Sequence, residues 1–395
     1  MKVILFFLFV AISPYVTAKT QLNIWHMSKE MDADITSTAS AFSDLYPDID
    51  VAVHFFPNEE LKASAVRAIG QQASPDIIII SSDNVGFAKV MRLSELPTEL
   101  AVETLPTTTL HALKFDNKHY SVPLFAGNHL ILFYNKTLVK TPAADWEQLF
   151  IQHAEFKAKG VKTLALNYQE PYWFSLFASL FGAELTIDGK VALDSDAMQQ
   201  ALQFYQKLGE SDIANMQCGY ECVSEDFFQG RYAYAINGTW SLSVARERLG
   251  DNLGIALFPQ LQQRKITPLA SYIVMVFPNQ SLTSDKAPQI KQLVQYFRQP
   301  ENLQSIAEKH FLTPYYQTDK ATLDSQRYAD PLYSQLIAQR KLTRLMPASS
   351  AMVSVWNGMQ KGMLLYQNST LDAPAAVEFM QKVSIRDQKM LEAGL

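Results

Sequence analysis

The stretch "SPDIIIISS", residues 74–82, decides the fold class. Its four successive isoleucines, Ile77 to Ile80, are followed at once by two serines. A run that is apolar at every position, and not only at every second one, is typical of a strand covered on both faces. Strands of that kind belong to parallel sheets with helices on both sides. The stretch therefore predicts a central strand of an α/β protein.

Two more strands are predicted upstream of this one, "LNIW" at 22–25 and "DIDVAVHFF" at 48–56. Between the strands, residues 32–45 carry apolar side chains at helical spacing, and residues 59–73 form a second helical stretch. Strands that alternate with helices in this way pair in parallel through right-handed crossovers. We therefore expect these three strands to lie in one sheet.

A second set of elements follows, which indicates a second lobe. A crossing segment is predicted near 125–128, between "SVPLF" and "HLILFYN". The block 145–260 contains its own helices, and "PLASYIVMVFP" at 268–278 is predicted to return as a strand. Residues 287–310 are predicted to add helices to the first lobe. A chain of 395 residues is long enough for two domains.

The first 18 residues are predicted to be a secretory signal peptide. Lys2 precedes ten apolar residues, Pro14 interrupts them, and small residues lead to a cut after Ala18. The mature protein is then expected in the periplasm. The net charge is −5 and no run of four basic residues occurs, which argues against nucleic acid and membrane surfaces as partners.

Polar side chains follow the predicted strands where these end. Ser28 and Lys29 follow the first strand, Asp83 and Asn84 follow the third, and Glu59–Glu60 begin the helix after the second. Open parallel sheets bind ligands beyond the carboxyl ends of their strands. Each residue alone is more typical of a helix cap or a loop, and it is their common placement that favours a binding site.

The stretch "NYQEPYWF", residues 167–174, has two interpretations. In one, Glu170 and Pro171 begin a helix and the aromatic residues are core. In the other, a fixed acceptor beside flat rings binds a sugar, which has hydroxyls at its rim and apolar faces. Trp240, at the end of a predicted strand, and Trp356, on a predicted helix, admit the same two interpretations.

The two cysteines, Cys218 and Cys222, are predicted to form a disulfide. An oxidising compartment favours the bond, and one helical turn places the two Cα atoms about 6 Å apart. A metal site is excluded because no further cysteine exists and the nearest histidines are far along the chain. Because the loop between the two cysteines is short, the disulfide is expected to stabilise the folded protein by only about 1–2 kcal/mol.

Taken together, the sequence resembles the maltodextrin-binding proteins, the periplasmic receptors of sugar-importing ABC transporters. The resemblance is carried, in order along the chain, by "LNIW", "SPDIIII", "YNK", "NYQEPY", "FQGRYAYAINGTW" and "LMPASSAMVSVW". It implies a periplasmic-binding-protein fold of two α/β lobes, each with a mostly parallel sheet, joined by a hinge of several crossings. The implied first lobe is 19–126 with about 275–328, and the second is 127–274 with about 329–395.

The resemblance also implies which residues bind the sugar. Lys29 falls where the family holds a lysine on the sugar, Asp83 and one of Glu59 or Glu60 where it uses acidic acceptors, and Trp240 and Trp356 at its tryptophan platforms. Ile80 replaces a usual tryptophan, which predicts weaker maltose binding. Asn84 and Gln360 replace usual arginines and Asn128 a usual glutamate. The full expected set is Ser28, Lys29, Glu59, Glu60, Asp83, Asn84, Asn128, Glu170, Pro171, Tyr172, Tyr220, Trp240, Trp356 and Gln360.

The function implied is that of a non-enzymatic, monomeric receptor, without metal or cofactor, that delivers maltodextrin-like oligosaccharides to the permease of an ABC importer. Two alternatives remain. A sensory receptor would present a sugar to a chemoreceptor or sensor kinase from the same closed surface. A glycoside hydrolase would need two facing carboxyl groups with separated pKa values, which the resemblance does not supply.

Overall fold

The computed structural model describes residues 19–100, 105, 107–316 and 331–395. The predicted signal peptide and residues 317–330 of the predicted lobes lie outside this part. No helix of the described part is long and apolar enough to cross a membrane. The strands are β1 Thr20–His26, β2 Ile49–Phe55, β3 Ile77–Ser81, β4 Lys114–Phe115, β5 Lys118–His119, β6 Ser121–Asn135, β7 Lys162–Ala165, β8 Thr186–Ile187, β9 Lys190–Val191, β10 Tyr232–Gly238, β11 Leu253–Ala256, β12 Leu269–Val276, β13 Thr313–Pro314 and β14 Arg344–Leu345.

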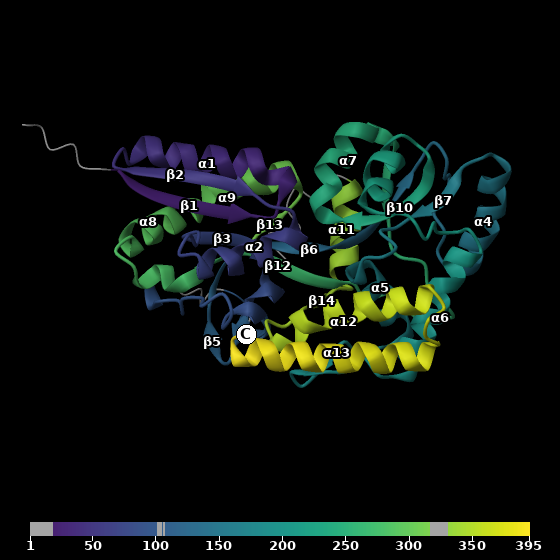
Figure 1. Cartoon of the computed structure of the whole chain (residues 1–395). Coiled ribbons are helices and arrows are strands. Elements are labelled where there is room, and N and C mark those ends of the chain that lie inside the picture. Colours follow the sequence, from purple (N-terminus) through teal and green to yellow (C-terminus); the bar gives the residue numbers. More distant parts are fainter. Residues whose placement is uncertain (1–18, 101–104, 106, 317–330) are drawn as a thin grey trace, which may run out of the picture.

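The helices cover both faces of the sheet (Figure 1). The α-helices are α1 Asp32–Leu45, α2 Asn58–Gly70, α3 Thr107–Ala112, α4 Trp146–Ala158, α5 Pro171–Phe181, α6 Asp196–Glu210, α7 Leu242–Leu249, α8 Ala287–Phe297, α9 Pro300–His310, α11 Pro331–Arg340, α12 Ser350–Gln367 and α13 Ala373–Ala393. The short helices are η1 Lys29–Met31, η2 Ser82–Phe87, η3 Thr98–Leu100, η4 Cys222–Asp226, η5 Thr239–Ser241, η6 Gly250–Asn252 and η7 Pro278–Thr283.

The isoleucine run is a central strand, as predicted. β1 pairs in parallel with both β2 and β3, and all five residues of β3 are buried. Ile77 and Ile79 pack into one hydrophobic core, and Ile78 and Ile80 pack into another on the opposite face. Successive side chains of a strand point to opposite faces of the sheet. An unbroken apolar run therefore packs against the helix layers on both faces.

Two lobes are visible in Figure 1, and β6 runs through both of them. Residues 121–129 of β6 pair with β12 in the first lobe, and residues 130–135 pair with β10 and β11 in the second. The sheet order is β2-β1-β3-β12-β6-β10-β7. The α/β two-lobe class is confirmed, but the sheet is mixed because β12 runs antiparallel to β3 and β6, and β6 runs antiparallel to β10.

The bend in β6 occurs at Gly127, which has φ +101° and so requires glycine. Its carbonyl accepts a hydrogen bond from the Thr239 hydroxyl at 2.8 Å and lies 2.7 Å from His129 Nδ1. His129 is fully buried, and burial lowers its pKa to about 3, so the ring is neutral. We call residues 127–129 of β6, together with the start of β12 paired with them, the hinge.

The two lobes have separate cores, each built from distant segments of the chain. The first lobe has a core on each face of its sheet, with residues from Leu22 to Leu312 and Ala348. The second lobe has one large core that runs from Leu130 to Leu269 and resumes from Leu332 to Met380.

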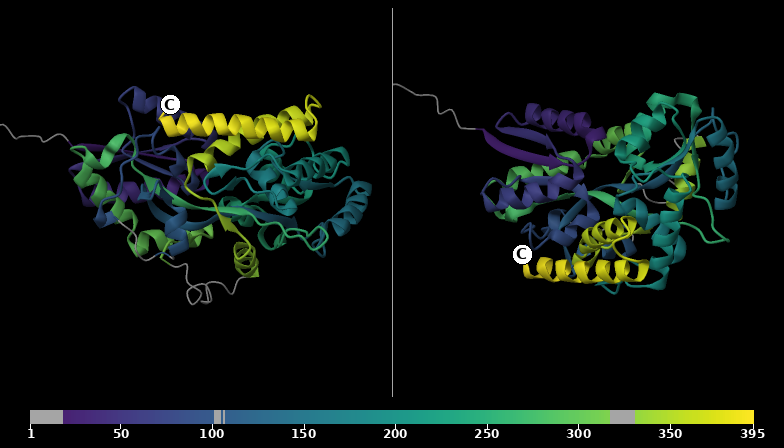
Figure 2. Two further views of the ribbon diagram at one scale, coloured as in Figure 1. Left: turned by 90° about the horizontal axis from the view of Figure 1, so that it is seen from below. Right: turned by 45° about the vertical axis from the view of Figure 1, so that its right-hand side comes forward.

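The last two helices pack on each other and lie along both lobes (Figures 1 and 2). The Lys89 ammonium of the first lobe donates to the Glu392 carbonyl near the end of α13 at 3.4 Å. Ser349, the N-cap of α12, touches Gly86 of η2, where a Cβ would lie only 2.3 Å from the Ser349 carbonyl oxygen. The first lobe therefore contacts the start of the helix that carries Trp356.

Candidate functional site

A polar network follows β3 and reaches the hinge. The Ser81 hydroxyl lies 2.6 Å from Asp83 Oδ1 and 2.6 Å from the Ser271 hydroxyl. Asn128 Nδ2 donates to Ser271 Oγ at 2.8 Å. Asp83 is only 5% exposed. The network joins the predicted residues Asp83 and Asn128 through two serines that sequence analysis did not single out.

The stretch "QEPY" begins α5, and Glu170 is its N-cap. The Glu170 carboxylate accepts from the Tyr172 backbone N–H at 3.5 Å, and Pro171 occupies the first turn, where proline is tolerated. Tyr172 donates its hydroxyl to the Leu269 carbonyl at 2.8 Å. Trp173 is buried and donates its indole N–H to the Ile236 carbonyl at 2.7 Å, so this ring belongs to the core.

Three predicted aromatic residues meet at one place, and we call Tyr172, Trp240 and Trp356 the ring group. The Tyr172 ring centroid lies 6.4 Å from that of Trp240 at an interplanar angle of 28°. It lies 5.9 Å from that of Trp356 at 83°. All three side chains are half-buried, and they come from α5, η5 and α12. Only tertiary folding brings together residues so far apart in the chain.

The ring group borders the first lobe. Burial raises the pKa of Tyr172, and the negative charge of Asp83 in the first lobe adds to this rise. Trp240 donates its indole N–H to the Tyr220 hydroxyl at 3.0 Å. Burial raises the pKa of Tyr220 to about 12. Both phenols therefore keep their protons at neutral pH and can donate hydrogen bonds.

Other predicted residues lie differently from what the resemblance implied. Ile80 is 1% exposed within the first-lobe core, and the weaker maltose binding expected from the missing tryptophan stays a prediction. Asn84 is 5% exposed and donates its amide to the Ser81 carbonyl at 3.2 Å, within its own loop.

The remaining members of the expected set are at the periphery. Lys29, Glu60 and Gln360 are exposed, and Ser28 is half-buried just before η1. Glu59 begins α2, but its side chain lies outside the described residues. Among the described contacts, none joins Lys29, Glu60 or Gln360 to the ring group. Their roles stay predictions that rest on the resemblance alone.

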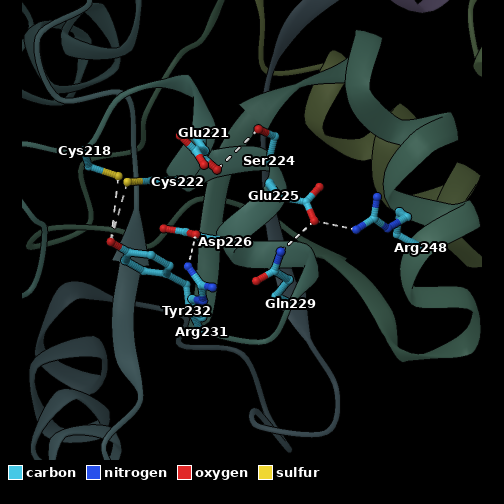
Figure 3. A network of polar contacts seen from close by, with 10 residues as sticks. All are labelled: Cys218, Glu221, Cys222, Ser224, Glu225, Asp226, Gln229, Arg231, Tyr232 and Arg248. Atoms are coloured by element: carbon cyan, nitrogen blue, oxygen red, sulfur yellow. Dashed lines mark hydrogen bonds and ion pairs between the residues drawn. The ribbon is translucent and has the colours of Figure 1, made fainter.

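The predicted disulfide is not formed in this structure. Cys218 and Cys222 are free cysteines, and the Tyr232 hydroxyl lies 3.9 Å and 3.8 Å from their sulfur atoms. Figure 3 shows the two sulfurs side by side above this hydroxyl. Burial raises the pKa of Cys218 to about 12, which keeps the thiol protonated at neutral pH. Cys222 begins η4, a π-helical turn, and such turns are frequent at functional sites.

Sequence reasoning missed Glu30, although it follows Lys29 directly. Burial raises the pKa of its carboxyl group, and Tyr220 of the second lobe is among the neighbours that influence this pKa. The signal was present, because the whole stretch after β1 is polar, but sequence spacing does not say which of these side chains faces the opposite lobe.

Two other features of the described part do not define a site. A cavity of about 440 Å³ is lined by β11, α11 and residues 142–144, and none of the predicted residues lines it. No group of three or more His, Cys, Asp or Glu side chains able to hold a metal ion occurs in the described ranges.

The two lobes, the strand that crosses between them and the rings at their border define a two-lobe ligand-binding protein. A model of the family "bacterial extracellular solute-binding protein" matches residues 37–333. The chain belongs to this family, and the resemblance found from sequence is confirmed.

Relatives and solved structures agree with this assignment. A maltotriose-binding protein of Pyrococcus abyssi (strain GE5 / Orsay) is 22% identical over 85% of this chain and 75% of its own length. The maltodextrin-binding protein MdxE of Bacillus subtilis (strain 168) is 23% identical over 73% of this chain and 71% of its own length. The maltose/maltodextrin-binding domain MalE from Bdellovibrio bacteriovorus, solved with maltotriose, superposes with a TM-score of 0.85 at 24% identity, covering 94% of this chain and 100% of the domain. The GacH receptor of Streptomyces glaucescens GLA.O superposes with a TM-score of 0.83 at 20% sequence identity. The superposition covers 94% of this chain and 99% of the receptor.

Proposed function

We propose that this protein captures a maltodextrin-like oligosaccharide between its two lobes. The observation that carries the proposal is the ring group, with the buried carboxylate of Asp83 beside it. Ring faces cover the apolar faces of pyranose units, and carboxylates accept hydrogen bonds from their hydroxyls. Two relatives, a maltotriose-binding and a maltodextrin-binding protein, support this ligand class.

The proposed role is delivery of the bound sugar from the periplasm to the permease subunits of an ABC importer. Membership of an extracellular solute-binding family supports an extracytoplasmic location. A sensory receptor remains the second candidate, since both partners would recognise the closed form. Deletion of neighbouring permease genes separates the two, because only transport would then be lost.

Calorimetric titration with maltose, maltotriose, longer maltodextrins, trehalose, sucrose and isomaltose tests the ligand class. We expect saturable one-to-one binding of at least one α-1,4-linked member of this panel. Binding of trehalose or sucrose alone would move the proposal to another sugar class. No binding of any sugar to folded protein would contradict it.

The enzymatic alternative has a separate test. Glycoside hydrolysis needs two carboxyl groups that flank the scissile bond, about 5–10 Å apart. We expect no new reducing ends after prolonged incubation with maltodextrins. If the wild-type protein released new reducing ends and the Asp83→Asn variant did not, the protein would be a glycoside hydrolase and not a receptor.

A further inference from the structure

A chain of side-chain hydrogen bonds runs from the hinge to Asp83. Asn128 of β6 and Ser271 of β12 are paired residues of the hinge, and the Asn128 amide donates to the Ser271 hydroxyl at 2.8 Å. The Ser271 hydroxyl lies 2.6 Å from that of Ser81, the last residue of β3. The Ser81 hydroxyl lies 2.6 Å from Asp83 Oδ1. We call these four side chains the relay, which crosses the neighbouring strands β6, β12 and β3.

The relay has a defined direction. An ionised carboxylate only accepts, so the single Ser81 proton points to Asp83. The contact between the two hydroxyls then takes the Ser271 proton, which leaves the Ser271 oxygen to accept from the Asn128 amide. Each of the three contacts thus receives one proton. An amide turned the other way would leave one contact with two facing oxygens and no proton.

Burial makes the direction of these contacts important. Ser81 and Asp83 are 7% and 5% exposed, and Ser271 is 1% exposed, so water does not compensate a polar atom that loses its partner here. The loop that carries Asp83 is also held on β12, because the Tyr272 backbone N–H donates to the Ser82 hydroxyl at 3.1 Å. With the backbone fixed in this way, the relay decides how the Asp83 carboxylate is turned.

The relay uses only one oxygen of Asp83. Within the described part of the chain, Oδ2 makes no hydrogen bond and is not an enclosed atom. A carboxylate with one oxygen held by the protein presents the other in a fixed direction. Such an oxygen is suited to accept a hydrogen bond from a ligand hydroxyl.

We infer that Asn128, Ser271 and Ser81 are positioning residues that orient the Asp83 carboxylate for the ligand from the hinge. The identity of the ligand rests on the proposed function, whereas the relay lies within the chain. Asn128 must be an amide in this arrangement, because a carboxylate of the same shape cannot supply the proton that begins the relay.

Two substitutions that exchange the amide and the carboxylate test the relay. Asn128→Asp keeps the shape but leaves two protons for three contacts, and maltotriose affinity should fall about tenfold. Asp83→Asn keeps the relay, with its amide oxygen toward Ser81, but turns an NH2 group to the ligand. Its affinity should also fall about tenfold or more.

The double variant carries the decisive prediction. With Asn128→Asp and Asp83→Asn together, the relay can run in the opposite direction, from the amide at position 83 to the carboxylate at position 128. The amide oxygen at position 83 then takes the open place of Oδ2. The double variant should therefore bind maltotriose at least about fivefold more tightly than Asp83→Asn alone, the contribution of one neutral hydrogen bond.

Two readouts do not require sugar. Urea unfolding of the ligand-free protein should show a lower midpoint for Asn128→Asp and recovery in the double variant. The side-chain NH2 signals of Asn128 in NMR spectra are assigned by their loss in Asn128→Asp. They should move in Ser81→Ala, although Ser81 reaches Asn128 only through Ser271. Circular dichroism checks that each variant is folded.

Two controls are matched to the exchange. Ser271→Ala interrupts the relay, so in that background the two substitutions should act additively. Asp251→Asn and Asn252→Asp make the same exchange between exposed neighbours of η6, and neither these variants nor their combination should alter affinity. If Ser271→Ala does not fold, Ser81→Ala interrupts the relay at its next member.

The outcomes separate the relay from the function. Recovery in the double variant, in both binding and unfolding, supports the positioning role. Additive losses in both measurements overturn it, and so does recovery of stability without recovery of affinity. Recovery of stability while the wild type binds no maltotriose would contradict the proposed function and leave the relay supported.

Discussion

Trp240 and Trp356 approach Tyr172 from two different elements, and each is half-buried, which leaves a ring face for a ligand. Truncation of an aromatic anchor costs about 2–4 kcal/mol, which corresponds to about 30- to 1,000-fold in affinity. We expect a loss in this range for Trp240→Ala and for Trp356→Ala, measured by titration with maltotriose. Circular dichroism serves as the control for folding. Unchanged affinity in both folded variants would remove these rings from the site.

The pH dependence of binding follows from Glu30. Burial raises the pKa of Glu30 above its ordinary value of 4.5, while a backbone hydrogen bond and the charge of Lys29 oppose the rise. When the lobes open, the carboxyl group returns to water. A group whose pKa is raised in the closed form stabilises that form fully below the ordinary pKa, and this contribution is lost as pH rises through the raised value.

We therefore expect maltotriose affinity to fall as pH increases from about 4.5 through the raised pKa of Glu30. Other groups titrate in this interval as well, so the measurement is the difference between wild type and Glu30→Gln, which cannot lose a proton here. Parallel pH profiles of the two proteins would contradict this assignment.

At the scale of elements, the segment that carries Tyr220 is the one with the two cysteines. Their side chains contact each other and share the Tyr232 hydroxyl, so oxidation needs only a small movement. We expect protein purified from the periplasm to contain the disulfide, seen by mass spectrometry without reductant as a deficit of about two hydrogens. Reduction should lower the free energy of unfolding by at most about 2 kcal/mol, because the loop is short. Two free thiols in periplasmic protein would refute the bridge.

Sequence patterns predicted the elements better than the contacts between them. The run Ile77–Ile80 indicated a strand with two covered faces, and the full burial of all four side chains confirms it. Alternating strands and helices predicted parallel pairing of β1 with β2 and β3, but the antiparallel runs of β6 and β12 depend on how the chain crosses between lobes. Glu170 is a helix N-cap, so the simpler interpretation of "QEPY" holds for its backbone, whatever its side chain binds.

At the scale of the molecule, closure is the testable property. A ligand held by both lobes shifts the population toward the closed form. We expect saturating maltotriose to reduce the radius of gyration in solution scattering. It should also stabilise the fold by about 2.7 kcal/mol at about 100 times its Kd, seen as a higher melting temperature. Sugar binding with an unchanged scattering curve would contradict the two-lobe clamp.

The interleaved cores have a consequence for how the protein is made. The first-lobe cores are complete once Ala348 has been synthesised, whereas the second-lobe core still lacks the apolar faces of α12 and α13. During synthesis on the ribosome, the apolar core residues of the second lobe therefore stay exposed until α12 and α13 have emerged. Long-range pairing of this kind is slow and prone to aggregation. A chain released after Ala348 should retain a cooperatively folding first lobe, yet depend on chaperones for its other half.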